Sequence, residues 1–458
     1  MRRGDERLRI AVVGTGIAGM SAAWLLSQAH EVTVYESATR VGGHSNTIDV
    51  PSEVPGGKVP VDMGFIVFNP PNYPNLTALF RHLEVPTQPS EMSFAVSLRG
   101  GALEYAGTDL GGLFAQKRNL VRPRFWAMLR DLARFYREAA GDAGRLAGET
   151  SLGHYLDANG YGDAFIRDHL LPMAAAIWSA PAERMADHPA AAFIRFCDNH
   201  GLLRLRDRPE WRTVTGGSRV YVQRLTAGYA DRIRLGCGVR SVRRLPHGVR
   251  VHDTQRVRVH DTQGADADYD HVVIAAHSDQ ALAMLADPSE AERTLLGAIG
   301  YGANEGVMHR DRALMPRRRR AWSSWNYIGG RAGDPDAMCA SYWMNRLQGL
   351  RATPDVFVTL NPVRAPDPAT VIHRESFTHP QFDAAALRAQ RDLWSLQGRR
   401  NTWFCGAWFG AGFHEDGLQA GLAVAEALGG VRRPWTVADP SGRIAHGDPA
   451  PPSRALAA

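Results

Sequence analysis

The amino-acid sequence predicts an α/β protein in which a nucleotide-binding domain is interrupted twice by a second, α+β domain. Two strand–glycine turn–helix patterns indicate the nucleotide-binding domain, at residues 9–28 and 402–428, and a mostly helical region at 125–204 indicates the insertion. Apolar residues make up 44% and charged residues 22% of the 458 residues, a balance typical of globular proteins. The chain is long enough for two or three domains with a large core.

The N-terminal segment predicts a βαβ unit. A short apolar strand pattern covers residues 9–13, a helix pattern runs from about Ile17 to Gln28, and a β-rich run follows at 31–35. Pro and Gly then cluster in 51–60, which predicts a hairpin or loop, and residues 76–83 predict a helix.

The character of the sequence changes at about residue 90. Strand patterns around 94–105 precede the helical region, strand signals return at 219–225 and dominate 232–274, and 299–392 mixes strands with aromatic-rich turns. The predicted domain parts are 1–89, 212–298 and 395–432 for the nucleotide-binding domain, 90–211 and 299–394 for the inserted substrate domain, and 433–458 for a flexible C-terminal tail rich in Pro, Ala and Gly.

A direct repeat lies in the strand-rich part. Residues 249–255 (Val-Arg-Val-His-Asp-Thr-Gln) recur at 257–263, eight positions later. An even shift keeps each residue on the same face of a strand, so the repeat can lengthen a hairpin without inverting it. We assign it no catalytic meaning.

The first glycine turn matches the G-x-G-x-x-G fingerprint of dinucleotide-binding proteins. It follows a strand, opens a helix, and is followed by an acidic residue at the end of the next strand, in the position that binds a ribose. The first glycine makes the tight turn, the second lets the backbone approach a pyrophosphate, and the third lets the helix pack on the strand. The residues predicted to hold the dinucleotide are Gly14, Gly16, Ile17, Ala18, Gly19, Glu36 and Ser37.

The continuation Arg40-Val41-Gly42-Gly43-His44-Ser45 favours FAD over NAD. Glu-x-x-x-Arg-x-Gly-Gly resembles the loop that glutathione-reductase-type and amine-oxidase flavoproteins place over the FAD diphosphate, and the resemblance assigns Arg40, Gly43 and His44 to the cofactor. In amine oxidases an Arg commonly takes the place of His44. This departure weakens the analogy with amine substrates and leaves the flavin assignment intact.

Two further motifs support a flavin. Val61-Asp62-Met63-Gly64-Phe65 resembles a D-x-G strand end that such proteins place beside the flavin, which assigns Gly64 and Phe65 to the site. The second glycine turn leads into an apolar helix, whose N-terminus is suited to the ribityl-phosphate or the pyrimidine edge of the flavin. The residues assigned there are Gly406, Asp416, Gly417 and Leu418.

With these motifs the chain is similar to the FAD-dependent amine oxidase and phytoene desaturase superfamily. The resemblance is closer to bacterial NAD/FAD-binding oxidoreductases found beside cyclopropane-fatty-acid synthases, on the segments 62–67, 91–94, 176–179 and 412–417. It implies a Rossmann-like FAD-binding domain of the glutathione-reductase type with an inserted α+β substrate domain. It also implies that Val239 contacts the adenine and that 215–217 is a turn linking the domains.

The residues that act on the substrate are less clearly marked. Many amine oxidases hold a water on the flavin with a central lysine, whereas this chain has no lysine after Lys117. His309 lies near the corresponding region and could replace it, although a lone histidine is more often a structural hydrogen-bonding group. His414 lies in the turn predicted to face the flavin, where it could act in catalysis or simply begin the helix.

Aromatic residues gather in the predicted inserted domain. Such residues line most small-molecule pockets, and they also form ordinary cores, so both an apolar substrate tunnel and a packed core are open. The set is Trp178, Trp322, Trp325, Tyr327, Tyr342 and Trp343.

The resemblance and these residues together predict an oxidoreductase with non-covalent FAD. We expect it to oxidise or desaturate an apolar substrate, such as a lipid acyl chain, by hydride transfer to the flavin. The acyl chain, and a functional link to a fatty-acid-modifying methyltransferase, rest on the family's gene neighbours. The alternatives are an amine or polyamine oxidase and, as a non-enzyme, a flavin-binding scaffold of a lipid-modifying complex.

Charge and cysteine usage narrow the partners and the compartment. The four cysteines lie far apart, which argues against a disulfide framework or a zinc site, and no metal is predicted. The arginine run 317–320 could touch anionic lipid or lie in solvent, and it lacks the length and aromatic interleaving of a nucleic-acid site. We expect a cytoplasmic protein, with peripheral contact to the inner membrane face left open.

Overall fold

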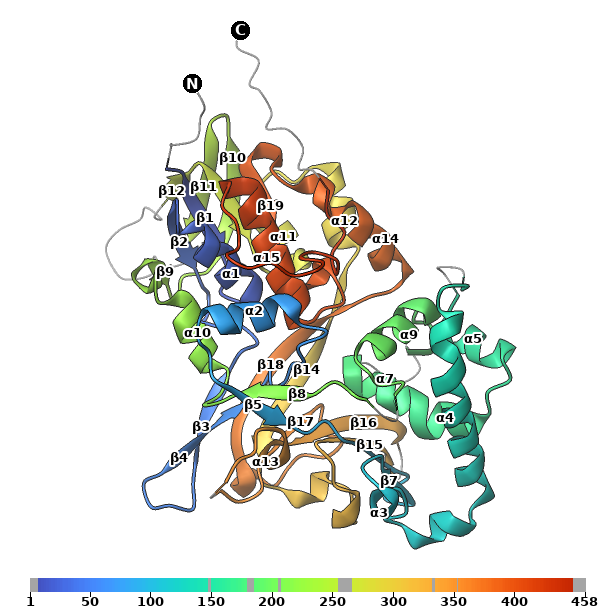
Figure 1. Ribbon diagram of the computed structural model, residues 1–458. Coiled ribbons are helices and arrows are strands. Elements are labelled where there is room, and N and C mark those ends of the chain that lie inside the picture. Colours follow the sequence, from blue (N-terminus) through green and yellow to red (C-terminus); the bar gives the residue numbers. More distant parts are fainter. Residues whose placement is uncertain are drawn as a thin grey trace.

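The computed structural model describes residues 7–146, 150–178, 185–204, 207–253, 266–331, 334–351 and 353–447. Two sheets organise this part of the chain, and each has its own hydrophobic core. Figure 1 shows the nucleotide-binding part above and the larger sheet below, with a group of helices beside it. The fold is therefore α/β, with a Rossmann-like domain and a second, α+β domain.

The smaller sheet has five parallel strands in the order β19-β13-β1-β2-β9. Its strands are short apolar runs because helices cover them, as parallel sheets require. Helices α1 and α15 pack against each other beside it. The bounds are β1 Arg9–Val13, β2 Glu31–Tyr35, β9 Ile233–Arg234, β13 His271–Ile274, β19 Thr402–Phe404, α1 Ile17–Leu26 and α15 His414–Gly429.

Further elements complete this domain. An antiparallel sheet is formed by β10 Val239–Leu245, β11 Gly248–Asp253 and β12 Asp266–Tyr269. The first copy of the repeat forms most of β11, and the second copy lies outside the described residues. The helices are α2 Pro74–His82, α10 Arg219–Thr226, α11 Ser278–Met284, α12 Glu290–Gly297 and α14 Ala384–Asp392.

The larger sheet has seven strands in the order β18-β14-β17-β16-β15-β6-β7, antiparallel except for β15 and β6. The long strands β14 and β18 run from this sheet up to the nucleotide-binding part (Figure 1). The bounds are β6 Phe94–Leu98, β7 Leu103–Ala106, β14 Gly300–His309, β15 Trp325–Arg331, β16 Asp334–Trp343, β17 Phe357–Leu360 and β18 Val371–Gln381.

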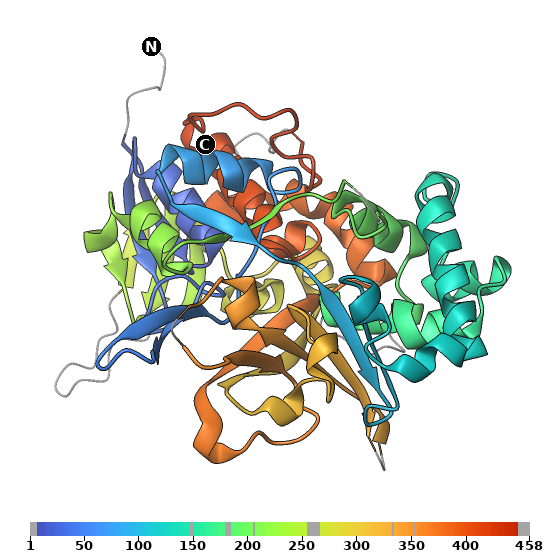
Figure 2. The ribbon, with the colours of Figure 1, turned by 60° about the horizontal axis from the view of Figure 1, so that its bottom comes forward.

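Helices lie to one side of the seven-stranded sheet (Figure 2). The longest described one, α4 Pro123–Asp142, starts with a proline at its first turn, where the missing N–H is tolerated. The other elements here are α3 Leu110–Leu113, α5 Leu152–Ala158, α6 Asp163–Phe165, a π-helical turn Ile166–Leu170, α7 Leu171–Trp178 and α9 Ala190–Asn199.

Two antiparallel strand pairs and one short helix complete the described elements. Strands β3 Thr47–Pro51 and β4 Lys58–Asp62 form the hairpin around the Pro/Gly cluster. Strand β5 Thr87–Ser90 pairs with β8 Trp211–Val214, and both lie where the chain passes between the two domains (Figure 1). The short helix is α13 Met344–Leu347.

One predicted strand is wrong. Residues 219–225 form helix α10 instead. The β-branched and aromatic residues of this segment favour a strand, but Tyr221, Val222 and Leu225 are spaced so that a helix buries all three, and α10 packs against α1. Tertiary packing overrides a weak local propensity here.

The first part of the predicted flexible tail, residues 433–447, packs against the rest of the chain. Arg433 and Ile444 are buried. The Arg433 guanidinium donates to Glu426 Oε1 at 2.8 Å and to Asn75 Oδ1 at 2.9 Å. One ion pair and one hydrogen bond to a buried amide hold this segment in place although its composition is typical of loops.

Candidate functional site

A cavity of about 800 Å³ runs between the two domains. It begins at the carboxyl ends of β1 and β2, where open α/β sheets bind ligands, and ends among side chains of the seven-stranded sheet and helices α7 and α9. One half is lined by glycine turns and the other by apolar side chains. These two halves suit the two parts of a flavoenzyme site, a dinucleotide and a substrate.

The first glycine turn has the geometry that its fingerprint predicts. Gly14 has a φ of 101°, and a Cβ there would lie 2.8 Å from Ala275 O. A Cβ on Gly19 would overlap Gly14 O, so Gly19 permits helix α1 to pack on the turn. Gly16 lines the cavity, and a Cβ there would meet no heavy atom within 4 Å. Gly16 therefore leaves room for a ligand rather than for packing, and Ile17 and Ala18 line the cavity beside it.

Glu36 lies at the cavity end of β2. Its carboxylate accepts hydrogen bonds from Thr15 N at 2.9 Å and from Ala38 N at 2.8 Å, which fix its orientation at the glycine turn. Ser37 and Val239 line the same end of the cavity. The structure thus brings the predicted ribose- and adenine-binding residues together.

The loop 40–45 crosses the middle of the cavity. Gly43 and His44 line it, whereas Arg40 does not. Arg40 Nη1 donates to Gly43 O at 2.8 Å, and its Nη2 pairs with Glu375 at 3.4 Å. Arg40 therefore holds the loop in shape, and its assignment to the cofactor stays a prediction.

Gly64 brings the next strand end against this loop. A Cβ on Gly64 would overlap His44 O, and Phe65 N donates to the same oxygen at 3.0 Å. The Nε2 atom of His44 is buried and has no hydrogen-bond partner among the described residues. Burial, together with His379 and His277 nearby, lowers the pKa of His44 to about 3. A neutral, unpartnered imidazole in a glycine-lined cradle fits a polar ligand such as FAD.

His414 lines the cavity and contacts the end of this loop. Its ring lies on Phe65, with centroids 3.9 Å apart and planes at 11°. Its Nε2 lies 2.7 Å from the Tyr221 hydroxyl and 3.3 Å from Ser45 Oγ. Burial lowers the pKa of His414 to about 3, so the ring is neutral and fixed. Gly406 lines the same region.

Asp416, Gly417 and Leu418 lie at the start of α15 and are not among the residues that line the cavity, and their assignment to the cofactor stays a prediction. Asp416 accepts from Phe413 N at 2.7 Å, which caps the helix, and from Arg443 Nε at 2.7 Å. Gly417 allows α15 to approach Ile17, because a Cβ there would lie 2.9 Å from Ile17 Cγ2. Leu418 is fully buried in the core.

His309 is also displaced from the site. It is fully buried on β14 and does not line the cavity. Its Nε2 bonds Thr359 Oγ1 at 2.7 Å, and its Nδ1 accepts from Asp311 N at 3.1 Å. Both ring nitrogens are satisfied, so His309 is a structural residue.

The comparison with known families decides the class of this site. The sequence profile of the family described as flavin-containing amine oxidoreductase matches residues 17–308. The chain belongs to this family. The family is described as flavin-containing, and the glycine-lined half of the cavity fits FAD.

Curated relatives are similar over part of their length. A Mycobacterium tuberculosis protein provisionally named a flavin-containing monoamine oxidase, AofH, is 32% identical over 257 residues, which are 54% of this chain and 54% of the relative. An L-amino-acid oxidase of Pseudechis australis is 48% identical over 48 residues, 10% of this chain and 9% of the relative. The chain thus spans about half the length of the first relative.

Solved structures share the fold at low identity. A fatty acid isomerase from P. acnes has a TM-score of 0.62 at 16% identity, covering 92% of this chain and 97% of its own. A putrescine oxidase has a TM-score of 0.62 at 14% identity, covering 92% and 98%. A cyclohexylamine oxidase from Brevibacterium oxydans has 0.61 at 16%, covering 92% and 100%. At these identities the likeness establishes the fold alone.

The half of the cavity away from the glycine turns is apolar. In the described part of its lining, the single acidic residue is Glu36, at the dinucleotide end, and there is no Lys or Arg. The apolar lining consists of Ile66, Val67, Met92, Phe94, Met173, Ile177, Phe196, Leu202, Trp211, Trp325, Tyr342, Val358, Leu360, Phe377 and Phe413.

The aromatic residues singled out in the sequence divide between these two roles. Trp325 and Tyr342 line the cavity. Trp322 and Trp343 pack in a separate small cluster with Phe357, and Tyr327 lies in the core of the larger domain. The Trp178 side chain lies outside the described atoms.

His200, which the sequence did not mark, lines the apolar half. It is 4% exposed, its Nδ1 lies 2.9 Å from Phe196 O, and its Nε2 has no partner among the described residues. Because a carbonyl only accepts, Nδ1 carries the hydrogen and Nε2 presents a lone pair. Burial lowers the pKa of His200 to about 4. A histidine one turn after Phe196 in a predicted helical region carries no functional signal.

The cysteines lie away from the cavity. All four are free and buried, and none lines it. Within the described ranges no group of three or more His, Cys, Asp or Glu side chains could hold a metal ion. No helix among the described residues is long and apolar enough to cross a membrane.

Proposed function

We propose that this flavoenzyme oxidises or desaturates an apolar substrate, such as a lipid acyl chain. The observation that carries the proposal is the apolar half of the cavity, in which the described lining has no carboxylate. An acyl chain can fill such a space without leaving a buried charge unpaired. Oxidation of an apolar substrate is the general form of the proposal, and oxidation of a lipid acyl chain is its most specific form.

The same lining argues against a cationic amine. An ammonium group taken into an apolar cavity needs a carboxylate or comparable partner to offset its desolvation. The one acidic lining residue, Glu36, already accepts hydrogen bonds from Thr15 and Ala38 at the dinucleotide end. An amine or polyamine oxidase remains the enzyme alternative, which an amine bound in its neutral form would favour.

The chain's own residues would orient the substrate and take its proton. FAD, when bound, supplies the acceptor for a hydride. Forming a C=C bond also releases a proton from the adjacent carbon, and we propose that His200 receives it, because its side chain lines the apolar half and its Nε2 has no partner among the described residues. The bond from Nδ1 to Phe196 O fixes the ring in the tautomer that leaves Nε2 free. We therefore infer that His200 is the catalytic base.

Similarity to known proteins is compatible with more than one substrate class. The fold is shared by a protein titled a fatty acid isomerase and by two titled amine oxidases. The non-enzyme alternative, a flavin-binding scaffold of a lipid-modifying complex, would be favoured by stable FAD binding without turnover. A functional link to a fatty-acid-modifying methyltransferase belongs to the same proposal.

Two measurements test the proposal. First, the acyl lipids of cells with and without the gene are compared by mass spectrometry, and we expect a change of two mass units, or its downstream products, in one acyl class. Second, purified holoprotein is mixed anaerobically with acyl lipids and, in parallel, with primary amines and polyamines, and flavin bleaching is recorded. Bleaching by amines alone, with an unchanged acyl profile, would overturn the lipid assignment.

A further inference from the structure

Exposed apolar side chains concentrate in one short segment of the larger domain. Six large hydrophobic residues are exposed in the described part of the chain, and four of them lie in residues 110–126. We call these four the apolar patch: Leu110 is 75% exposed, Leu120 51%, Val121 81% and Trp126 50%. Scattered exposed hydrophobics need no explanation, but a cluster of this kind marks an interaction surface.

The local structure holds these side chains outward. Leu110 begins α3, and Leu120 and Val121 end the 3₁₀ turn 117–121 that precedes α4. Trp126 Nε1 donates to Leu120 O at 2.9 Å, and the Trp126 ring packs near Phe114 with centroids 5.8 Å apart. The polar atom of the indole is thus satisfied within the protein while half of the side chain stays exposed. The apolar patch therefore belongs to helical structure with satisfied hydrogen bonds rather than to a frayed loop.

Basic side chains surround the apolar patch. Arg320 lies over α3, where a Cβ on Gly111 would meet its guanidinium, and a Cβ on Gly101 would lie 2.8 Å from Arg317 Cδ. The 3₁₀ turn 319–321 packs against α3. We call Lys117, Arg118, Arg122, Arg317 and Arg320 the basic rim.

The basic rim is not neutralised within the protein. None of its five members forms an ion pair with a carboxylate among the described residues; Arg118 and Arg122 instead both donate to Ala102 O. Burial lowers the pKa of Arg122, and the positive charges of Arg118, Arg99 and Arg318 lower it further. The nearby carboxylates are engaged elsewhere: Glu104 with Arg318, Asp168 with Arg99 and Arg124, and Asp109 as the cap of α3.

We propose that the apolar patch and its basic rim dock the protein on the surface of an anionic lipid bilayer. Apolar and tryptophan side chains enter the interfacial region, and the basic side chains remain at the level of anionic headgroups, which is the arrangement that peripheral proteins use. Because no described helix can cross a membrane, the contact is with the surface. Charge selects this occupant over a second copy of the chain, since the basic rims of two copies would repel.

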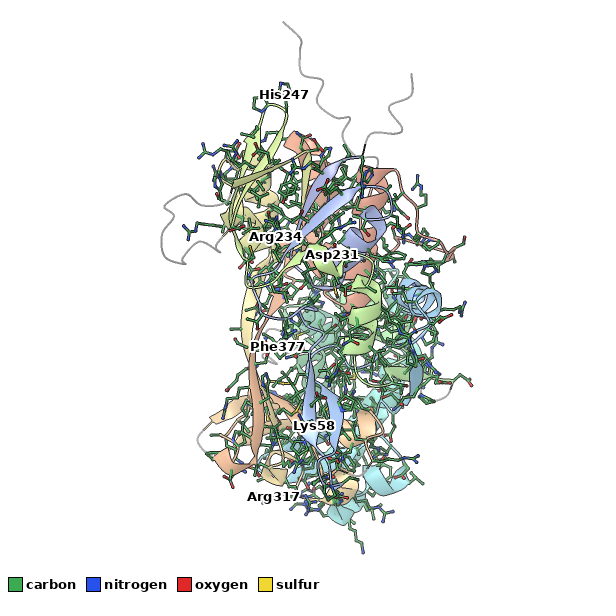
Figure 3. All side chains as sticks on the ribbon, turned by 90° about the vertical axis from the view of Figure 1, so that its left-hand side faces the viewer. Lys58, Asp231, Arg234, His247, Arg317 and Phe377 are labelled. Atoms are coloured by element: carbon green, nitrogen blue, oxygen red, sulfur yellow. The ribbon has the colours of Figure 1, made fainter. Side chains whose placement is uncertain are left out.

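The position of the patch on the molecule suits such docking. Figure 3 places Arg317 at the end of the molecule opposite to His247, and α3 lies at the same lower end in Figure 1. Strand β6 begins at Phe94, which lines the cavity, and ends at Leu98, next to the turn 99–101 that Arg317 covers. Strand β6 thus connects the substrate half of the cavity with the turn that Arg317 covers. The inference rests on the surface alone and not on the proposed substrate.

Vesicle co-sedimentation of the holoprotein tests the proposal. The probes are vesicles of phosphatidylcholine alone and vesicles that also contain about 30% phosphatidylglycerol, an anionic lipid. We expect at least about tenfold more binding to the anionic vesicles, weakening several-fold between about 0.1 M and 0.5 M salt. The variants are Val121→Asp on the patch and Val54→Asp as the matched control, since Val54 is 58% exposed on the distant β3–β4 hairpin.

The outcomes separate docking from the alternatives. Val121→Asp should lose at least about fivefold of the binding with its flavin absorbance unchanged, and Val54→Asp should lose less than about twofold. Equal loss in both variants, equal binding to neutral vesicles, or no binding at all would overturn the proposal. So would a concentration-dependent dimer that Val121→Asp abolishes, because the patch would then cover a second copy. Turnover is not measured, so failure here leaves the proposed substrate untouched.

Discussion

Arg443 Nε donates to Asp416 Oδ1 at 2.7 Å, and this pair ties the C-terminal segment to the first turn of α15. Asp416 is fully buried and also caps the helix through Phe413 N. The turn 411–414 that this helix start supports forms one wall of the FAD cavity. Asp416, which the sequence predicts to bind the cofactor, thus supports a wall of the cavity without being among its lining residues.

Replacing Arg443 with Ala should destabilise the protein strongly. Removal of one partner of a buried ion pair leaves the other charge uncompensated, at a cost of about 3–5 kcal/mol. Arg432→Ala is the matched control: its side chain is 81% exposed, 4.0 Å from Glu426, and its loss should cost no more than about 1 kcal/mol. Denaturant unfolding of both variants measures the difference. Similar midpoints for the two would contradict a supporting role for the pair.

Ala substitutions at Gly16 and Gly19 should fail in different ways. Gly16→Ala meets no atom within 4 Å and should fold normally, but its methyl group would occupy space needed by the pyrophosphate and weaken FAD binding about tenfold or more. Gly19→Ala would overlap Gly14 O and should lower stability by about 1–3 kcal/mol. Apoprotein melting and FAD titration separate the two effects. Normal FAD affinity in Gly16→Ala would remove the first turn from the cofactor site.

Replacing His200 should slow the chemistry and leave the cofactor bound. We expect His200→Ala to lower kcat by about 10²–10⁴, the usual contribution of a general base, with unchanged FAD content. His309→Ala is the control, since His309 is equally buried but lies outside the cavity. Exogenous imidazole should partly restore kcat in His200→Ala. A change confined to KM, or no rescue, would make His200 a structural residue.

Stability should fall as the pH drops below 6.5. Burial lowers the pKa of His169 and His309 to about 4, and of His44 and His414 to about 3. Between pH 6.5 and these values the unfolded chain binds protons that the folded chain does not, so each histidine removes ~1.4 kcal/mol per pH unit. Asp62, whose pKa burial raises to about 6, acts in the opposite direction and offsets only part of the loss. A melting temperature at pH 5.5 equal to or above that at pH 7.5 would refute this.

FAD should be released on acid precipitation, leaving a colourless pellet. Cys405 is fully buried in the turn after β19, burial raises the pKa of its thiol, and it does not line the cavity. The thiolate needed for attachment to the ring is therefore neither formed nor in reach. Histidines do line the cavity, so the absorbance of the pellet is the decisive measurement. A pellet that stays yellow would mean a covalent link.

The elements that sequence patterns predicted well are those whose signal is local. The turn 14–19 and Glu36 were placed correctly because glycine spacing and strand length determine a βα turn almost by themselves. Residues 219–225 were misjudged because local propensity opposed the packing of Tyr221 and Leu225. No sequence pattern marks His200, since it joins the cavity lining only when α9 is placed.

The sequence by itself determined the cofactor class. Gly14, Gly16 and Gly19 act through backbone space within a few residues, and that information is written in their order along the chain. Only the tertiary structure decided which remote side chains share the cavity, that His309 and Asp416 turn away from it, and that its substrate half holds no described carboxylate. Such relationships depend on contacts between residues hundreds of positions apart, which arise when the two sheets bury their apolar faces, and no local pattern encodes them.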